Sequence, residues 1–246
     1  MEPEIRLALI KNFAIPIALR KTGNMTATDA TQFSARLRSV TQEDHHAAES
    51  SDFITTLMGG ERSARDYMLL IAQYHYIYGA LEEEVRVLAA DPELGEILDA
   101  ALERSGQIAK DLDVLLPAHG LKEIPAALPA TEAYVAAIRA SAAEPARLVA
   151  HHYLRYLGDL SGGLAIGKLV SRHYSIPDEA LNMWKFEAID KPKIYKDSYR
   201  DKLDVFGANT SHAEAVLDEA KRGFQWNKAI FEDLLKASAS ELSAAS

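Results

Sequence analysis

The chain has 246 residues, of which 48% are hydrophobic, so it is long enough for one large domain with a sizeable core. It contains no cysteine, which excludes disulfide bonds, zinc–thiolate sites, iron–sulfur clusters and thiolate-ligated iron, and which is compatible with the cytoplasmic location that we expect. The formal net charge of −9 makes nucleic acid an unexpected partner, and we predict none.

Residues 1–30 are predicted to be a flexible N-terminal extension. Lys11 interrupts the apolar residues near its start and no clear small-residue cleavage site follows, unlike a secretory signal. Met25 remains an alternative start of the protein. No apolar run in the sequence reaches the length of a membrane span, so we expect no integral membrane anchor.

Helical periodicity dominates the rest of the chain, and no segment shows convincing strand alternation. The clearest pattern is an apolar face that begins at Tyr67 and ends at Leu88, with Glu82 to Glu84 largely off it. We predict an all-α, single-domain bundle of about eight helices over residues 31–237, followed by a disordered Ala/Ser tail at 238–246. The segments expected to be helical are 32–49, 51–58, 67–88, 92–116, 130–142, 145–174, 177–187, 192–206 and 211–237.

Three glycines occur within six residues of a segment that otherwise reads as helix: Gly158, Gly162 and Gly163. Each glycine costs about 1 kcal/mol relative to alanine inside a helix, so a compensating role is expected. One interpretation is a flat ligand lying against the helix backbone, and the other is tight packing against a second helix. The glycines alone favour packing, whereas the polar neighbours Asp159 and Ser161 favour a ligand.

Adjacent histidines at positions 45 and 46 are candidate metal ligands. Neighbouring helical side chains point about 100° apart, so at most one of the two faces the interior. A lone helical histidine is more often a surface or core residue than a ligand. The sequence contains no HxxxH pair, which gives a multi-histidine metal site little support.

A basic face is expected where Lys193, Lys196 and Arg200 follow one another at spacings of three and four. Such a face is usually a solvated stripe, but it could also clamp carboxylates or phosphates. Tyr153 and Arg155 precede the glycines, and together with the tyrosines of the 67–88 helix they could form a polar network inside the bundle.

Five separated segments resemble haem oxygenases in order and spacing, across about residues 32–237. The run Tyr153-Leu-Arg-Tyr-Leu-Gly-Asp-Leu-Ser-Gly-Gly163 closely resembles the family signature. The other four segments are His45-x-x-Ala48-Glu49, Tyr78-Gly-Ala-Leu-Glu-Glu-Glu84, Lys193-Ile-Tyr-Lys-Asp-Ser-Tyr-Arg200 and Phe224-x-x-Asn227-x-x-x-Phe231.

The resemblance implies that haem is both substrate and cofactor, and that His45 rather than His46 is the iron ligand. Glu49 would hold the ring N–H of that histidine. Gly158 and Gly162 would lie over the distal face of the haem. Asp159, with Tyr78 and Arg155, would hold an ordered water network that delivers a proton to the bound oxygen.

The resemblance also implies a set of haem-binding residues. Lys196, Arg200 and Tyr153 would meet the propionates, and Arg38 stands where the family often has a lysine. Gln42 stands where some members have a second lysine, so the resemblance implies no propionate anchor there. Ile54 and Leu57 replace family residues near the ring, which could alter ring seating slightly. The remaining haem-binding residues implied by the resemblance are Ser161, Phe224, Asn227 and Phe231.

The implied reaction consumes haem, O2 and electrons and yields biliverdin, CO and ferrous iron. The electrons would come from an external reductant, through a ferredoxin or a flavoprotein reductase, and the protein is expected to be a monomer. Three alternatives remain: a haem carrier without turnover, a di-metal carboxylate bundle and a helical scaffold module. Asp159 argues against a haem carrier, which needs no proton-relay carboxylate. The lack of paired Glu-x-x-His motifs argues against a di-metal bundle, and the shared motifs argue against a scaffold module.

Overall fold

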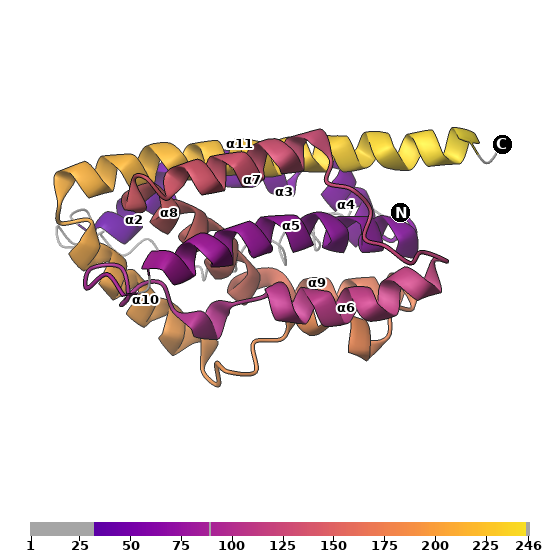
Figure 1. The fold of residues 1–246 in the computed structure, drawn as a ribbon, viewed down its shortest axis with the longest axis horizontal. Helices are drawn as coiled ribbons and strands as arrows, with labels where there is room; N and C mark the ends of the chain where they lie inside the picture. The colour runs from indigo at the N-terminus through magenta and orange to yellow at the C-terminus, as the bar shows by residue number, and fades with distance from the viewer. Residues whose placement is uncertain (1–31, 89, 245–246) are drawn as a thin grey trace, which may run out of the picture.

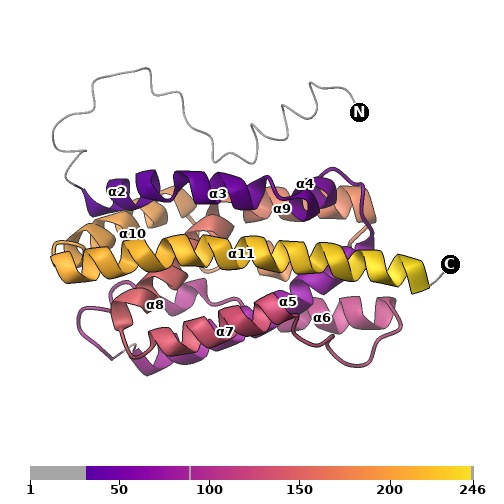
Figure 2. The same cartoon turned by 90° about the horizontal axis from the view of Figure 1, so that it is seen from above.

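The computed structural model describes residues 32–88 and 90–244, and within these ranges every regular element is a helix (Figure 1). This confirms the predicted all-α class. The helix α5 (Ala64–Leu88) runs through the middle of the bundle, and α11 (Thr210–Ala244) lies along one side of it (Figures 1 and 2). The other α-helices are α2 (Phe33–Val40), α3 (Gln42–Glu49), α4 (Asp52–Met58), α6 (Ser105–Ala118), α7 (Pro129–Ser141), α8 (Pro145–His152), α9 (Gly158–Tyr174) and α10 (Pro192–Phe206).

The core forms around two helices whose apolar faces follow the predicted period. On α5 the face from Tyr67 to Val85 is buried, and on α11 the face from Ala213 to Leu234 is buried as well. The helix α5 packs against α6 and α7, and α11 packs against α8, α7, α3 and α4. No helix in the described ranges is long and apolar enough to cross a membrane.

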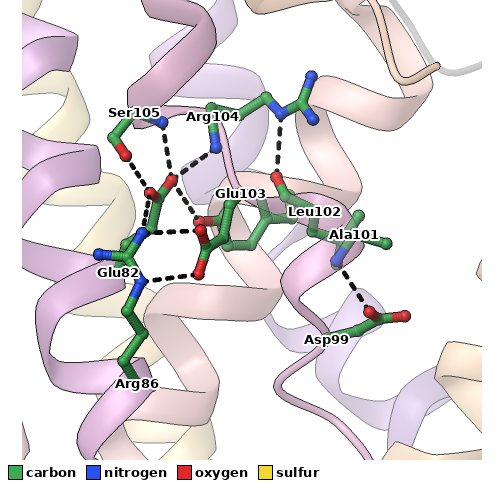
Figure 3. Close-up of polar contacts among 9 residues, drawn as sticks. Glu82, Arg86, Asp99, Ala101, Leu102, Glu103, Arg104 and Ser105 are labelled. Carbon is green, nitrogen blue, oxygen red and sulfur yellow. Dashed lines mark hydrogen bonds and ion pairs between the residues drawn. The ribbon is translucent and has the colours of Figure 1, made fainter. Parts of the chain in front are cut away.

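The expectation that Glu82 lies off the buried face is wrong, because Glu82 is fully buried. Its carboxylate accepts hydrogen bonds from the backbone amides of Arg104 (2.5 Å) and Ser105 (2.9 Å) at the start of α6 (Figure 3). The first amides of a helix have no partner within the helix, and a carboxylate can supply one. Glu82 therefore joins α5 to the N-terminus of α6.

The helix predicted over 92–116 begins only at Ser105. Asp91 accepts a hydrogen bond from the amide of Glu93, and Asp99 accepts one from the amide of Ala101. Short acidic side chains that bind nearby amides compete with helix formation, so turns and a 3-10 helix (Ala100–Leu102) replace the first part of the predicted helix.

The segment predicted as a helix over 177–187 contains two short 3-10 helices instead, Asp178–Ala180 and Asn182–Trp184. The buried carboxylate of Asp111 on α6 accepts hydrogen bonds from the amides of Asn182 (2.7 Å) and Met183 (2.8 Å). These bonds tie the segment to α6 and take amides that a continuing α-helix would use.

The structure describes most of the predicted C-terminal tail but not the predicted N-terminal extension. The N-terminal extension predicted over residues 1–30 lies outside the described residues. The helix predicted to end at 237 continues to Ala244, so α11 extends into the segment predicted to be a tail. The buried hydroxyl of Ser238 hydrogen-bonds the carbonyl of Leu234 (2.9 Å) and the carboxylate of Asp66, which fastens this part of α11 to α5.

Candidate functional site

The first part of the site is on α3, where the two adjacent histidines differ in environment. His45 is half-buried, with 31% of its side chain exposed, and His46 is exposed. His45 Nδ1 lies 3.2 Å from a carboxylate oxygen of Glu49, one turn later, and the imidazole meets the ring of Phe224 at 5.3 Å. With Nδ1 oriented by Glu49, Nε2 is the nitrogen of His45 suited to bind a metal.

The second part of the site is the start of α9, where the glycines have two different roles. A Cβ atom built on Gly158 or Gly162 meets no other heavy atom within 4 Å, so the space beside both is open. A Cβ atom on Gly163 would lie 3.1 Å from the ring of Trp184, and one on Gly167 would lie 3.4 Å from it. The packing interpretation is therefore confirmed for Gly163, whereas Gly158 and Gly162 leave open space that a ligand could occupy.

A continuous polar network lies beside the open glycines. Tyr78 on α5 donates its hydroxyl to the carboxylate of Asp159 on α9, and Arg155 Nε donates to the Tyr78 oxygen over 3.1 Å. Arg155 Nη1 donates to the amide oxygen of Asn227 over 2.7 Å. The structure thus brings together Tyr78, Arg155 and Asp159, as the sequence predicted, and adds Asn227 to them.

This network depends on a local change of helix type between α8 and α9. Residues Tyr153–Leu157 form one π-helical turn, which inserts an extra residue per turn and re-aims the side chains that follow. Arg155, from this turn, lies over the rings of Tyr74 (4.5 Å) and Tyr78 (4.8 Å). These contacts compensate in part for burying its charge.

Burial controls the protonation of the network. It raises the pKa of Asp159 above its ordinary value, while the nearby Arg155 guanidinium and the Tyr78 hydroxyl act to lower that pKa. Burial likewise raises the pKa of Tyr78 well above its ordinary value. A carboxyl group whose pKa is raised by burial lies closer to the range in which side chains act as general acids and bases.

Basic side chains gather at the edge of the site. Lys196 Nζ donates to Ser161 Oγ over 3.1 Å, and burial with the neighbouring Arg200 lowers the pKa of Lys196. Burial raises the pKa of the Tyr153 phenol, and the charges of Arg200 and Arg38 act to lower that pKa. Two cations and a phenol beside Lys196 form a donor set suited to carboxylates.

Some residues singled out in the sequence lie elsewhere or have another partner. Lys193 is 91% exposed and pairs with Asp197, so it belongs to a solvated surface. The ring of Phe231 stacks on Phe53 of α4 at 6.3 Å, within the packing of α4 against α11. The hydroxyl of Ser161 donates to the carbonyl of Leu157 over 2.6 Å.

The sequence did not predict two neighbours of the network, Tyr156 and Glu82. Tyr156 donates to the carboxylate of Glu82 over 3.2 Å, and its ring lies 5.7 Å from that of Tyr78. The available signal was spacing, because Glu82 follows Tyr78 by four residues and so shares its side of α5. No comparable signal in the sequence distinguishes Tyr156 from the other apolar and aromatic residues around it.

The chain matches known proteins along most of its length. The family model described as heme oxygenase matches residues 31–233. The heme oxygenase of Porphyra purpurea is 34% identical over 200 residues, which are 80% of this chain and 84% of that protein. Heme oxygenase 1 of Rattus norvegicus is 33% identical and covers 82% of this chain and 71% of that protein.

Solved structures agree with the sequence matches. The structure of heme oxygenase-1 from the cyanobacterium Synechocystis, in complex with heme, aligns with a TM-score of 0.78 and 30% identity over 87% of this chain and 99% of that one. The heme oxygenase of Leptospira interrogans aligns with a TM-score of 0.73 and 32% identity over 81% and 98%. The chain therefore belongs to the haem oxygenase family, whose activity is the oxidative cleavage of haem to biliverdin.

Proposed function

We propose that this chain holds haem between α3 and α9, with His45 as the iron ligand and with Gly158 and Gly162 on the other face of the ring. The helix α3 lies over α9 in Figure 2 and above it in Figure 1. The observation that carries the proposal is the pairing of a half-buried, Glu49-oriented imidazole with a helix that has open space beside two glycines. A flat ring fits such a helix face because no Cβ stands in its way.

The propionates are assigned to the basic edge of the site. Lys196 and Arg200 supply charge, Arg38 adds a third cation, and the Tyr153 hydroxyl can donate a hydrogen bond. Arginine matches the two oxygens of a carboxylate, whereas lysine acts as a point charge. Phe224, which contacts His45, would pack beside the ring on the side of its ligand.

When bound, haem supplies the iron that activates O2 and the ring that is opened. The protein residues supply space and protons. Gly158 and Gly162 leave room for dioxygen, and the Asp159 carboxyl, fixed by Tyr78, holds water at that face and passes protons on. Arg155 and Asn227 keep Tyr78 in place. Because glycine has no side chain, these two positions place no acid or base beside the open space.

The complete reaction consumes O2 and electrons from an external reductant and yields biliverdin, CO and ferrous iron. A ferredoxin or a flavoprotein reductase is the proposed electron donor. We place the protein in the cytoplasm, in line with its lack of cysteine, and propose a monomer. Gel filtration of the haem-loaded protein tests the monomer directly.

The first experiment adds one equivalent of hemin, records the Soret band, then supplies O2 with ascorbate or a ferredoxin system. Loss of the Soret band with growth of biliverdin absorption is expected for the wild type. Asp159→Ala should keep the Soret band, and its rate of biliverdin formation should fall about 100-fold or more because proton transfer is impaired. Asp113→Ala, at an exposed carboxylate of α6, is the control. Unchanged turnover in Asp159→Ala rejects the proton role, and a haem spectrum that survives O2 and reductant favours a haem carrier.

The iron ligand is tested with the two histidines of α3. His45→Ala should abolish the histidine-ligated ferrous–CO spectrum, and added imidazole should restore it. His46→Ala, which changes an exposed neighbour, should leave that spectrum unaltered. A normal spectrum in His45→Ala would assign the ligand to another residue.

A further inference from the structure

A row of aromatic side chains leads from the polar network to α10. The ring of Tyr156 lies 5.7 Å from that of Tyr78 and 4.6 Å from that of His152. The ring of His152 in turn stacks on Tyr199 at 5.7 Å, with the planes only 5° apart. Tyr195 stands one turn before Tyr199 on α10 and is half-buried, so it brings the row to the surface.

Every phenol in this row donates to, or shares a proton with, a base. Tyr78 donates to Asp159, and Tyr156 donates to Glu82 over 3.2 Å. The hydroxyl of Tyr199 is 2.8 Å from His152 Nδ1, and that of Tyr195 donates to Asp99 over 2.7 Å. Three carboxylates and one imidazole therefore serve the four phenols.

Buried tyrosines usually have a hydrogen-bond partner, but outside the row the buried Tyr134 hydroxyl has none among the described residues and three other hydroxyls bind carbonyls. The hydroxyls of Tyr67, Tyr76 and Tyr174 donate to backbone carbonyls, of Ala180, Pro125 and Leu57 respectively. A carbonyl cannot take up a proton at physiological pH, whereas a carboxylate or a neutral imidazole can. The row is thus distinguished by its bases, not only by ring contact.

The bases are held in a state that can accept protons. Burial lowers the pKa of His152 to about 3, so its imidazole is neutral and Nδ1 can accept from Tyr199. Glu82 is fixed by the amides of Arg104 and Ser105 and lies 3.3 Å from the Arg86 guanidinium, as Figure 3 shows. A phenol that loses an electron becomes a strong acid, and such a partner takes its proton without any movement of heavy atoms.

A second aromatic path leads away from Tyr78 through Tyr74 to Trp184, at 5.8 and 6.3 Å. The Arg155 guanidinium lies 4.5 Å from the centre of the Tyr74 ring, and a cation at this position makes removal of an electron from the ring harder. Tyr78 also faces Arg155, but the Asp159 carboxyl on its hydroxyl offsets that effect. The base-paired row is the favoured path.

We propose that Tyr78, Tyr156, Tyr199 and Tyr195 form a one-electron relay that carries oxidising equivalents from the haem site to the surface at α10, where an external reductant consumes them. This relay rests on the proposed haem site. Its role is to protect the enzyme when peroxide reacts at the haem outside the normal cycle.

The overall reaction conserves electrons and atoms. One hydrogen peroxide becomes two waters by taking up two electrons and two protons. One ascorbate monoanion supplies both electrons and one proton as it becomes dehydroascorbate, and the solvent supplies the second proton. In each transfer a phenol gives up an electron and passes its proton to its own base. The next tyrosine in the row returns an electron, and the base returns the proton. No residue is consumed.

The test traps the relay with haem-loaded protein, one equivalent of hydrogen peroxide and the nitroso spin trap 2-methyl-2-nitrosopropane, followed by peptide mapping. In the wild type we expect adducts at Tyr195, and ascorbate should suppress them. In Tyr156→Phe the adduct at Tyr195 should fall severalfold while one at Tyr78 grows. Glu82 keeps its other donors in this variant, so the fold is retained. In Tyr199→Phe the adducts should move to Tyr156.

Tyr76→Phe is the matched control, because it removes one phenol of α5 whose partner is a carbonyl, and it should give the wild-type pattern. Protein without haem should give no adduct. An adduct pattern in Tyr156→Phe that equals the wild-type pattern overturns the relay, as does the absence of tyrosine adducts in a protein with a normal Soret band. A missing Soret band would instead overturn the proposed haem site.

Discussion

Arg155 Nη1 donates to the side-chain oxygen of Asn227 over 2.7 Å, in a part of the bundle where both residues are buried. This bond joins the π-helical turn before α9 to α11. It also fixes the guanidinium that donates to Tyr78. Because Tyr78 in turn donates to Asp159, the bond acts on Asp159 through two further hydrogen bonds.

Asn227→Ala should therefore weaken both the fold and the reaction. A buried, charged N–H left without its acceptor costs about 1–3 kcal/mol, which urea unfolding will measure. Haem should still bind, whereas biliverdin should form more slowly because Arg155 no longer holds Tyr78. Lys228→Ala, at an exposed position of the same helix, is the control. If Asn227→Ala has wild-type stability and wild-type turnover, the bond has no such role.

The glycines of α9 allow a test with opposite outcomes. Gly162→Leu should reduce haem affinity strongly with little loss of stability, since its side chain enters open space. Gly163→Leu should destabilise the protein by about 1–3 kcal/mol through overpacking against Trp184. Hemin titration and urea unfolding of both variants are the measurements. Equal effects of the two substitutions on haem affinity would contradict the assignment of separate faces.

These same glycines mark how far sequence alone could go. Helical period correctly placed α5, α10 and the buried face of α11, because local spacing decides which residues share a face. It could not divide Gly162 from Gly163, since that depends on where Trp184 lies in the fold. Period also failed over 92–104, where the Asp91 and Asp99 side chains take the amides that a helix would need.

The candidate site shows the same limit. The motifs brought Tyr78, Arg155 and Asp159 together as predicted, but the partners of these residues arise from tertiary contacts. Asn227 was expected at the haem, and the structure engages its amide oxygen with Arg155. The spacing of four from Tyr78 indicates on which side of α5 Glu82 lies, but its contact with the start of α6 arises only in the fold.

The basic edge of the site predicts a difference between two lysines of α10. Lys196→Met should raise the dissociation constant for hemin about fivefold, because a partly exposed ion pair contributes up to about 1 kcal/mol. Lys193→Met changes a 91% exposed side chain and should leave the constant unaltered. Titrations at low and high salt add a second check, since screening should shrink the difference. Equal constants for the two variants at low salt would remove Lys196 from the clamp.

His152 predicts how stability depends on pH. In the folded protein burial lowers the pKa of His152 to about 3 from an ordinary 6.5, with the charge of Asp99 acting weakly in the opposite direction. The unfolded chain therefore binds a proton first as the pH falls. The contribution of His152 to stability is complete above about pH 6.5 and is lost progressively as the pH falls toward about 3.

His152→Phe keeps a flat ring between Tyr156 and Tyr199 and removes the titrating group. Its free energy of unfolding should be lower at neutral pH, because the Tyr199 hydroxyl loses its partner, yet it should fall less steeply with acidification than that of the wild type. Urea unfolding of both proteins across this range gives the two slopes, and each pKa unit corresponds to about 1.4 kcal/mol. The acidic side chains titrate in both proteins, so only the difference between the slopes reports on His152. Parallel slopes would mean that folding does not shift the pKa of His152, and that burial does not hold its imidazole neutral as the pH falls.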